Sequence, residues 1–256
     1  MPNERETLKK WKLKTGDCLF YMHIPKTGGT TIYKYLKELF GQENVLIYPD
    51  SKYPTFFEGL YPDQFSQFRF FRQHAKYTFY KYLPRKPVYI TFLRHPVTRV
   101  ISFYRHVCRV KTHSLHADVV RNNVGITDFV EHFPLEEIEN LQVKFFAGYS
   151  TAKETDKDLL EIALMRLHEF AFFGILESFT ESIRLLSYTF DWEIGELGKE
   201  NAAPTPTCID NIADSAVQAI LEKNTLDMKL YEEAEVLFTN RINELERIHE
   251  WKNGTG

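Results

Sequence analysis

The fold is decided by the stretch Cys18-Leu19-Phe20-Tyr21-Met22-His23-Ile24-Pro25-Lys26-Thr27-Gly28-Gly29-Thr30-Thr31. Residues 18–24 form a short apolar run, which is typical of a strand buried on both faces of a parallel sheet. Pro25 and the glycine pair end this run and predict a turn. From Thr30 to Phe40 apolar residues recur every three or four positions, which predicts a helix. The stretch is therefore expected to fold as strand, glycine loop and helix.

A second unit of the same kind occupies residues 87–109. The segment Pro87–Leu93 is predicted to be a strand, and Pro96 stands where a helix favours its first residue. Residues 97–109 continue with helical spacing. Further strands are expected at 171–175, 45–48 and 68–71, with helices near 157–169 and 177–190.

The alternation of strands and helices predicts an α/β fold. We expect a P-loop-like three-layer arrangement, with a central, mostly parallel sheet flanked by helices and a helical C-terminus from Ile212 to about Glu250. Residues 1–14 are expected to be a polar lead-in, and residues 15–256 a single domain. Ligands of such sheets bind at the carboxyl ends of the strands, where both turns described above lie.

Composition restricts the possible partners and the compartment. The net charge of −3 over 256 residues gives no bulk electrostatic attraction to nucleic acid, so no nucleic-acid partner is expected. The three cysteines, Cys18, Cys108 and Cys208, are far apart and form no metal or redox motif, which fits a reducing compartment. The charged N-terminus does not resemble a signal peptide, and no apolar run is long enough for a membrane span.

The glycine loop has the properties of an anion site. Gly28 and Gly29 allow backbone N–H groups to approach a phosphate, and the helix that follows offers unpaired N–H groups. Thr30 and Thr31 add hydroxyl donors, and Lys26 adds a mobile charge. The order differs from the common nucleotide P-loop, in which the lysine follows the glycines. The alternative is an ordinary strand–helix turn.

A second polar group surrounds the next predicted helix. Arg94 lies just before this helix, and Ser102 lies two turns into it on the side that carries Thr98. An arginine and a serine so arranged can bind a phosphate through charge-assisted hydrogen bonds. The alternative is a surface helix with scattered polar residues.

Together the two motifs resemble the PAPS-dependent sulfotransferases, where PAPS is 3'-phosphoadenosine 5'-phosphosulfate. The resemblance is to the carbohydrate sulfotransferases, in particular the heparan sulfate 6-O- and 2-O-sulfotransferase branch, and it covers roughly residues 18–240. It is carried by HIPKTGGTTI, YITFLRHPVTRVISFYRHV, FAFFGILESF and NTLDMKLYEEAEVLF. It implies transfer of a sulfuryl group from PAPS to a hydroxyl, expected on a glycan, with release of 3',5'-ADP.

The resemblance also implies residue roles. Lys26 is expected to contact the sulfate and the oxygen that bridges it to phosphate, and Arg94 and Ser102 to hold the 3'-phosphate. A loop near the C-terminal end closes over the nucleotide in this family, and Lys199 and Asn201 occupy the matching place. The 5'-phosphate is expected to be held by Thr27, Gly28, Gly29, Thr30 and Thr31.

The proposed general base is His74, in Arg72-Gln73-His74-Ala75-Lys76, because the glycan branch has a catalytic histidine between the two motifs. A neutral imidazole can take a hydroxyl proton near pH 7. The alternative is a partly exposed structural histidine. His23 is interpreted as structural because it lies in the apolar run, and His95 stands where the family often has aspartate. No metal is expected to be required.

The acceptor is expected to contact the basic segment that follows the 3'-phosphate motif. Arg105, Arg109 and Lys111 are the candidate acceptor-binding residues, and their charge favours an anionic glycan. The alternative is a solvated basic loop.

Two rival functions stay open. One is a P-loop nucleotide kinase or NTPase, which would need a Gly-Lys-Ser/Thr order that is absent here. The other is a non-catalytic glycan- or nucleotide-binding protein of the same fold. Animal members of the family are usually anchored in the Golgi, whereas this sequence shows no membrane span. We therefore expect a bacterial-type cytoplasmic enzyme or, alternatively, a Golgi lumenal domain without its anchor.

Overall fold

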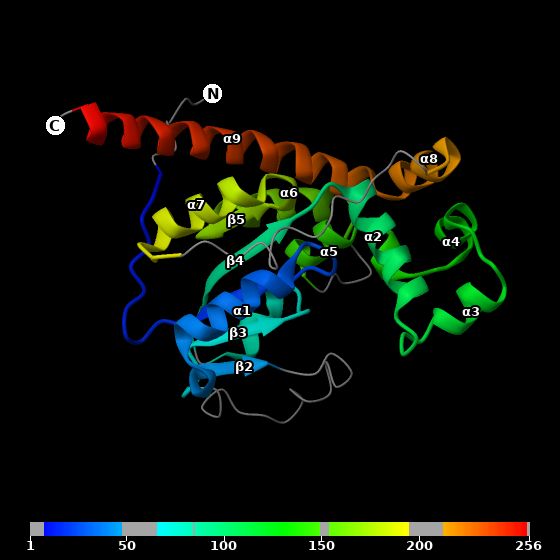
Figure 1. Cartoon of the computed structure of the whole chain (residues 1–256), viewed down its shortest axis with the longest axis horizontal. Coiled ribbons are helices and arrows are strands. Elements are labelled where there is room, and N and C mark those ends of the chain that lie inside the picture. The colour runs from blue at the N-terminus through cyan, green and yellow to red at the C-terminus, as the bar shows by residue number, and fades with distance from the viewer. Residues whose placement is uncertain (1–7, 48–65, 84, 149–153, 195–211, 255–256) are drawn as a thin grey trace.

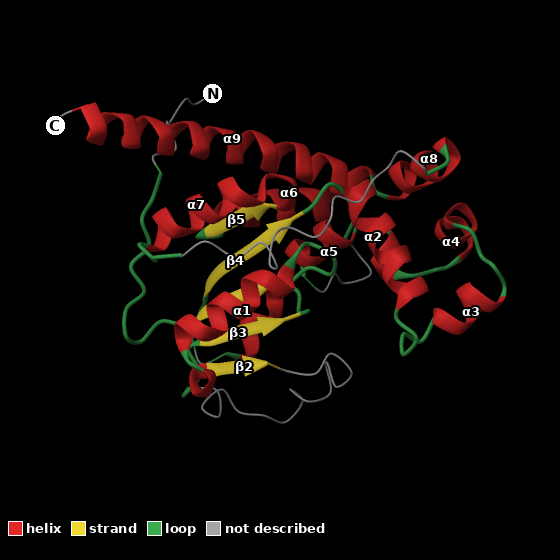
Figure 2. Ribbon diagram, in the orientation of Figure 1, coloured by secondary structure: helices red, strands yellow, loops and turns green. Residues whose placement is uncertain are grey.

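The protein is built around one parallel sheet (Figures 1 and 2). The computed structural model describes residues 8–47, 66–83, 85–148, 154–194 and 212–254. Five parallel strands pair in the order β2-β3-β1-β4-β5. Their bounds are β1 Leu19–Met22, β2 Val45–Ile47, β3 Phe70–Gln73, β4 Val88–Leu93 and β5 Phe172–Ile175.

Strand β1 is the centre of the sheet. It pairs with β3 on one side and with β4 on the other, and Met22 is level with Gln73 and with Thr91. All four residues of β1 are buried. Because successive side chains of a strand point to opposite faces, both faces of the sheet are covered. The predicted three-layer α/β architecture is therefore confirmed.

Helices make up most of the remaining described chain. The bounds of the α-helices are α1 Gly29–Phe40, α2 Pro96–Arg109, α3 His116–Arg121, α4 Ile126–His132, α5 Leu141–Ala147, α6 Asp156–Glu169, α7 Phe179–Phe190, α8 Asp214–Lys223 and α9 Thr225–Gly254. Short 3-10 helices are η1 Gln42–Asn44, η4 Tyr77–Tyr82, η5 Glu136–Ile138 and η6 Leu176–Ser178. Within the described residues, no helix is both long enough and apolar enough to cross a membrane.

Two clusters of apolar side chains stabilise these elements. The larger one surrounds the sheet, and helix α9 runs along one side of it beside α6 and α7 (Figure 1). The smaller one joins α2, α3, α4 and α8 through side chains such as Val100, Phe129 and Ile220. Helix α2 contributes to the smaller cluster and begins directly after β4, so it connects that cluster to the end of the sheet.

The structure differs from the sequence prediction in local detail. Strand β3 ends at Gln73, two residues later than predicted, which places its end level with that of β1. Helix α2 ends at Arg109 as predicted, whereas the short helices α3, α4 and α5 were not predicted. In the described part of the N-terminal segment, the Trp11 N–H donates to the Thr189 carbonyl at 2.6 Å.

Candidate functional site

The residues singled out by the sequence gather where the strands end. In Figure 2 the arrowheads of the strands point toward the side of the molecule that carries α2. The β1–α1 loop follows β1, His74 follows β3, Arg94 follows β4, and Glu177 lies in η6 after β5. Four consecutive neighbours in the sheet thus contribute polar groups to one edge.

The backbone of the β1–α1 loop has an unusual conformation. Lys26 and Gly28 both have positive φ values, 70° and 83°. A side chain at Gly28 would be strained by this φ and would also meet Leu176, whose Cδ1 is 2.5 Å from the position of a Cβ. Gly28 cannot cap α1 with a side chain, so the first N–H groups of the helix remain available to an anion.

The threonines of this loop play different parts. Thr27 is buried, and its hydroxyl donates to the Ile24 carbonyl at 2.9 Å. The hydroxyl of Thr27 therefore stabilises the turn. A phosphate could be bound by the backbone N–H of Thr27. Thr31 is half-buried in the first turn of α1, and the side chain of Thr30 lies outside the described residues.

Lys26 lies in strongly positive surroundings. Burial, together with the nearby charges of Arg109 and Arg94, lowers the pKa of its ammonium group to about 8. The loop carbonyl of Lys26 also accepts a hydrogen bond from Arg94 Nη1 at 3.2 Å. Three cations at one place favour the binding of an anion, because an anion would relieve their mutual repulsion.

Arg94 joins the two polar motifs. It is buried, with 4% of its surface exposed, and its backbone N–H and C=O both bond to the side chain of Gln142, at 3.0 and 2.9 Å. Its Nε donates to Thr98 Oγ1 at 3.1 Å and lies 3.9 Å from a carboxylate oxygen of Glu177. The guanidinium therefore has a fixed position between the loop and α2.

Sequence reasoning missed two of these partners. Gln142 is the second residue of α5 and contacts Arg94 from 48 residues away. Glu177 accepts hydrogen bonds from Thr98 Oγ1 at 2.9 Å, the His95 N–H at 3.1 Å and Tyr231 Oη at 3.1 Å. Both are ordinary polar residues in the sequence, and only their long-range contacts distinguish them.

One face of α2 continues from this point. Thr98, Ser102, Arg105 and Arg109 recur at intervals of three or four residues, so they share a side of the helix. Ser102 is half-buried, and Arg105 and Arg109 are exposed. The charge of Arg105 lowers the pKa of Arg94, and that of Arg109 lowers the pKa of Lys26, so both arginines lie near the site. Lys111 is exposed in the turn beyond α2.

His74 lies against a second histidine. Its Nε2 lies 2.6 Å from Nδ1 of His23, and the same Nδ1 lies 2.8 Å from Nη2 of Arg72. The two rings are 4.4 Å apart between centroids. His23, interpreted from the sequence as structural, thus contacts the proposed base. The sequence analysis did not predict this contact, because it depends on the pairing of β1 with β3.

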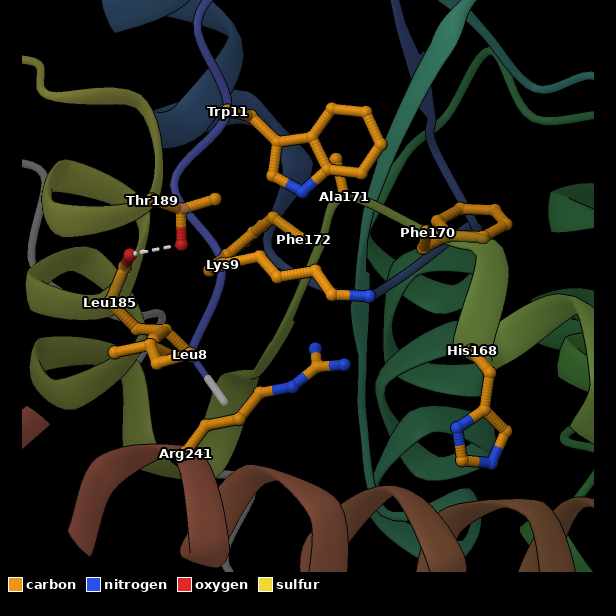
Figure 3. Close-up of a pocket in the computed structure, with 10 residues that line it drawn as sticks. All are labelled: Leu8, Lys9, Trp11, His168, Phe170, Ala171, Phe172, Leu185, Thr189 and Arg241. Carbon is orange, nitrogen blue, oxygen red and sulfur yellow. Dashed lines mark hydrogen bonds between the residues drawn. The ribbon is translucent and has the colours of Figure 1, made fainter. Parts of the chain in front are cut away.

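Two other features contain none of the predicted site residues. Asp128, Glu131 and His132 form an exposed group of potential metal ligands on α4. A pocket near the beginning of β5, at the opposite end of the sheet, includes Lys9 and Arg241 (Figure 3). Lys199 and Asn201 lie outside the described residues.

Comparison with known proteins identifies the family. Residues 12–232 match the model of the family described as the Sulfotransferase family. The chain belongs to the sulfotransferase family. This sulfotransferase is 26% identical over 283 residues to heparan-sulfate 6-O-sulfotransferase 1-B of Danio rerio, a match that covers 90% of this chain and 68% of the relative. It is 26% identical over 291 residues to heparan-sulfate 6-O-sulfotransferase 1 of Homo sapiens, which covers 93% of this chain and 69% of the relative.

The family membership confirms the resemblance seen in the sequence and favours the sulfotransferase interpretation over a kinase. The geometry of this sulfotransferase fits an anionic nucleotide donor. A loop without side-chain capping, a half-buried lysine and a buried arginine meet at the end of the sheet. An imidazole pair lies beside them.

Proposed function

We propose that this sulfotransferase moves the sulfuryl group of PAPS to a hydroxyl of a glycan and releases 3',5'-ADP. One observation carries the proposal: the His23 ring touches both the start of α1 and His74. A Cβ on Gly29 would lie 1.9 Å from Nε2 of His23, and Nδ1 of His23 lies 2.6 Å from His74. The expected donor loop and the expected base are therefore one imidazole apart, which is the proximity that a direct transfer needs.

The reaction is an in-line displacement at sulfur. The acceptor oxygen forms a bond to sulfur while the bond between sulfur and the 5'-phosphate oxygen breaks. The acceptor proton moves to His74, and the electron pair of the broken bond stays on the phosphate oxygen of 3',5'-ADP. Lys26 and the N–H groups at the start of α1 stabilise this developing charge.

The donor would be held at two places. The 5'-phosphate would lie on the backbone of residues 27–31, with the hydroxyl of Thr31 as a further donor. The 3'-phosphate would lie near Arg94 and Ser102, for which Arg94 offers a fixed charge. We retain Lys199 and Asn201 as proposed nucleotide contacts. No step of the proposed reaction uses a metal ion.

Two observations support an anionic glycan as the acceptor. The relatives that match most of the chain are named heparan-sulfate 6-O-sulfotransferases. In addition, Arg105 and Arg109 extend positive charge along α2 from Arg94 and Lys26. Lys111 would act at the margin of this surface, because it lies in the turn after the helix.

A transfer assay tests the proposal. The protein is incubated with PAPS and with heparan-type, neutral and small phenolic acceptors, and products are analysed by mass spectrometry. We expect the mass gain of one sulfate on the heparan-type glycan, also in the presence of EDTA. Binding of 3',5'-ADP without transfer to any acceptor would support the non-catalytic alternative, and magnesium-dependent ATP consumption would support the kinase. The cytoplasmic location and the single-domain organisation stay predictions.

A further inference from the structure

We infer that His23 is a positioning residue, which holds the ring proton of His74 on Nε2 and so makes Nδ1 of His74 the atom that takes the acceptor proton. The inference rests on the proposed function, because it assigns the atom that performs the proposed base chemistry. It goes further in giving a role to a buried histidine outside the expected set of site residues.

The sheet brings the two histidines together. Strands β1 and β3 are parallel neighbours in which Met22 is level with Gln73. His23 directly follows β1 and His74 directly follows β3, so the two histidines lie side by side at the carboxyl ends of these strands. Arg72 lies on β3 one position before Gln73 and reaches the same nitrogen of His23. The contact is thus set by strand register rather than by a flexible loop.

The two contacts of His23 Nδ1 favour one assignment of the protons. An arginine guanidinium can only donate, so Nδ1 of His23 must present its lone pair to Arg72 Nη2, at 2.8 Å. Nε2 of His74 lies 2.6 Å from that same atom. Two unprotonated nitrogens would repel each other at this distance, so Nε2 of His74 carries a proton and donates it to His23. A neutral His74 therefore has its lone pair on Nδ1.

Nδ1 of His23 can remain a hydrogen-bond acceptor because the surroundings keep this imidazole unprotonated. Burial lowers its pKa well below the ordinary value, and the charges of His74, Arg72 and Lys26 act in the same direction. The ring of Tyr21 also faces it, at 5.5 Å between centroids. No acidic group is among these neighbours in the described chain. A proton taken by His74 would consequently stay on His74 rather than move to His23.

The His23 ring packs against the β1–α1 loop. A hypothetical Cβ on Gly29 would lie 1.9, 2.0 and 2.7 Å from Nε2, Cδ2 and Cε1 of this ring, so the ring lies directly on the glycine backbone. A neutral His23 with its lone pair on Nδ1 carries its proton on Nε2, the edge that faces Gly29. The φ of Gly29 lies outside the left-handed region. We therefore attribute the glycine at this position to the space that His23 needs.

Nuclear magnetic resonance of the imidazole nitrogens tests the inference without any turnover. In full-length protein with ¹⁵N-labelled histidine, we expect His23 and His74 both to carry their proton on Nε2 at a pH where they are neutral. Signals are assigned by correlating each ring with its own backbone, so no variant is needed. A proton on Nδ1 of His23, or on Nδ1 of His74, would overturn the inference even if the variants below do not fold.

Three variants add a functional readout. His23→Phe keeps a ring but removes the acceptor, so His74 should become a mixture of tautomers. Its kcat should fall about 10–100-fold, below the roughly 10²–10⁴-fold loss expected for His74→Ala, while 3',5'-ADP affinity stays nearly unchanged. His23→Asn can return an acceptor oxygen near the position of Nδ1 and should restore most of the rate. His168→Phe, at the opposite end of the sheet (Figure 3), is the matched control.

The outcomes separate the inference from the proposed function. If the wild-type protein transfers no sulfate from PAPS, the proposed function fails, whatever the tautomers are. If the wild-type protein is active but His23→Phe leaves the His74 tautomer or kcat unchanged, the inference alone fails. An equal loss in His23→Asn and His23→Phe would also contradict it, because shape rather than an acceptor atom would then be what His23 supplies.

Discussion

Lys26 combines an unusual backbone with an unusual charge state. A lysine at φ 70° occupies the left-handed region that residues with a side chain rarely adopt, and such strain persists only where the surroundings hold it. Here the Arg94 guanidinium bonds to the Lys26 carbonyl, and the buried hydroxyl of Thr27 bonds to Ile24. The strained turn directs the backbone around the expected anion site.

The pKa of Lys26 predicts how donor capture depends on pH. In the free enzyme this pKa is lowered from 10.5 to about 8, so the ammonium is charged below pH 8 and becomes neutral as the pH rises through 8. We expect kcat/KM for PAPS to fall above about pH 8. In Lys26→Arg the group stays charged, so any remaining activity should lose this alkaline decline. Steady-state rates from pH 6 to 10 measure both, and the same decline in both enzymes would contradict the assignment.

Gly29 and His23 are predicted to be energetically coupled. Gly29→Ala places a methyl group within 1.9 Å of the His23 ring, so it should lower the thermal unfolding temperature. In Gly29→Ala with His23→Ala the methyl group gains space, so the double variant should lose less stability than the sum of the two single variants. Additive losses in unfolding free energy would show that the alanine is tolerated without contact with His23.

Helix α5 holds the second motif in place although it contributes no expected ligand. Asp227, near the start of α9, accepts the N–H groups of Gln142 and Val143 at 3.0 and 2.8 Å. The side chain of Gln142 then holds the backbone of Arg94. A chain of hydrogen bonds thus connects the C-terminal helix to the guanidinium at the end of β4.

Removing Gln142 should therefore weaken both the fold and the site. Gln142→Ala leaves the buried N–H and C=O of Arg94 without their partners, which should cost about 1–3 kcal/mol of unfolding free energy. We also expect weaker binding of 3',5'-ADP because Arg94 loses its fixed position. Urea denaturation and calorimetry measure the two effects. Gln218→Ala on the exposed side of α8 is the control, and its stability should change by less than about 0.5 kcal/mol.

The polar face of α2 is predicted to bind anionic acceptors more tightly than neutral ones. Arg109 lies close enough to Lys26 to lower its pKa, whereas Lys111 lies beyond the end of the helix. Arg109→Glu should therefore raise the KM of an anionic glycan more than Lys111→Glu does. The KM of the wild type should rise with salt, because exposed charges are screened over about 10 Å at 0.1 M. Equal responses of neutral and anionic glycans would remove α2 from acceptor binding.

An element could be predicted when its own residues form a recognisable pattern, and not when it depends on residues distant in the sequence. Strands β1, β4 and β5 and helices α1 and α2 were predicted because their apolar residues are local and periodic. Helices α3, α4 and α5 have six or seven residues each, too few for a clear period. The contacts of His23 and Gln142 depend on residues about fifty positions away, so only the register of the sheet and the packing of α5 reveal them.

At the scale of the whole molecule, the site lies where the two apolar clusters meet. The β1–α1 loop is flanked by Ile24 and Ile32 of the sheet core, and α2 belongs to the smaller cluster with α4 and α8. A ligand that bridges Lys26 and Ser102 would therefore connect two packed units, and it should stabilise the folded state by mass action.

Nucleotide binding should follow this expectation. We predict that 3',5'-ADP raises the thermal unfolding temperature more than AMP does, because AMP lacks the phosphate expected near Arg94 and Ser102. Arg94→Ala should remove most of the difference, since a charge-assisted hydrogen bond contributes about 1.5–3 kcal/mol. Equal shifts with both nucleotides in the wild type would contradict the assignment of the 3'-phosphate.

The central position of β1 has a consequence for synthesis on the ribosome. Among the described strands, β1 pairs with β3 and β4, which begin at residues 70 and 88, and helix α9, which anchors α5, begins at residue 225. The apolar side chains of β1 are therefore exposed until these later segments have been synthesised, which slows folding and favours chaperone binding. The β1–α1 loop is likewise made before Arg94, which bonds to it, and before Gln142, which holds Arg94.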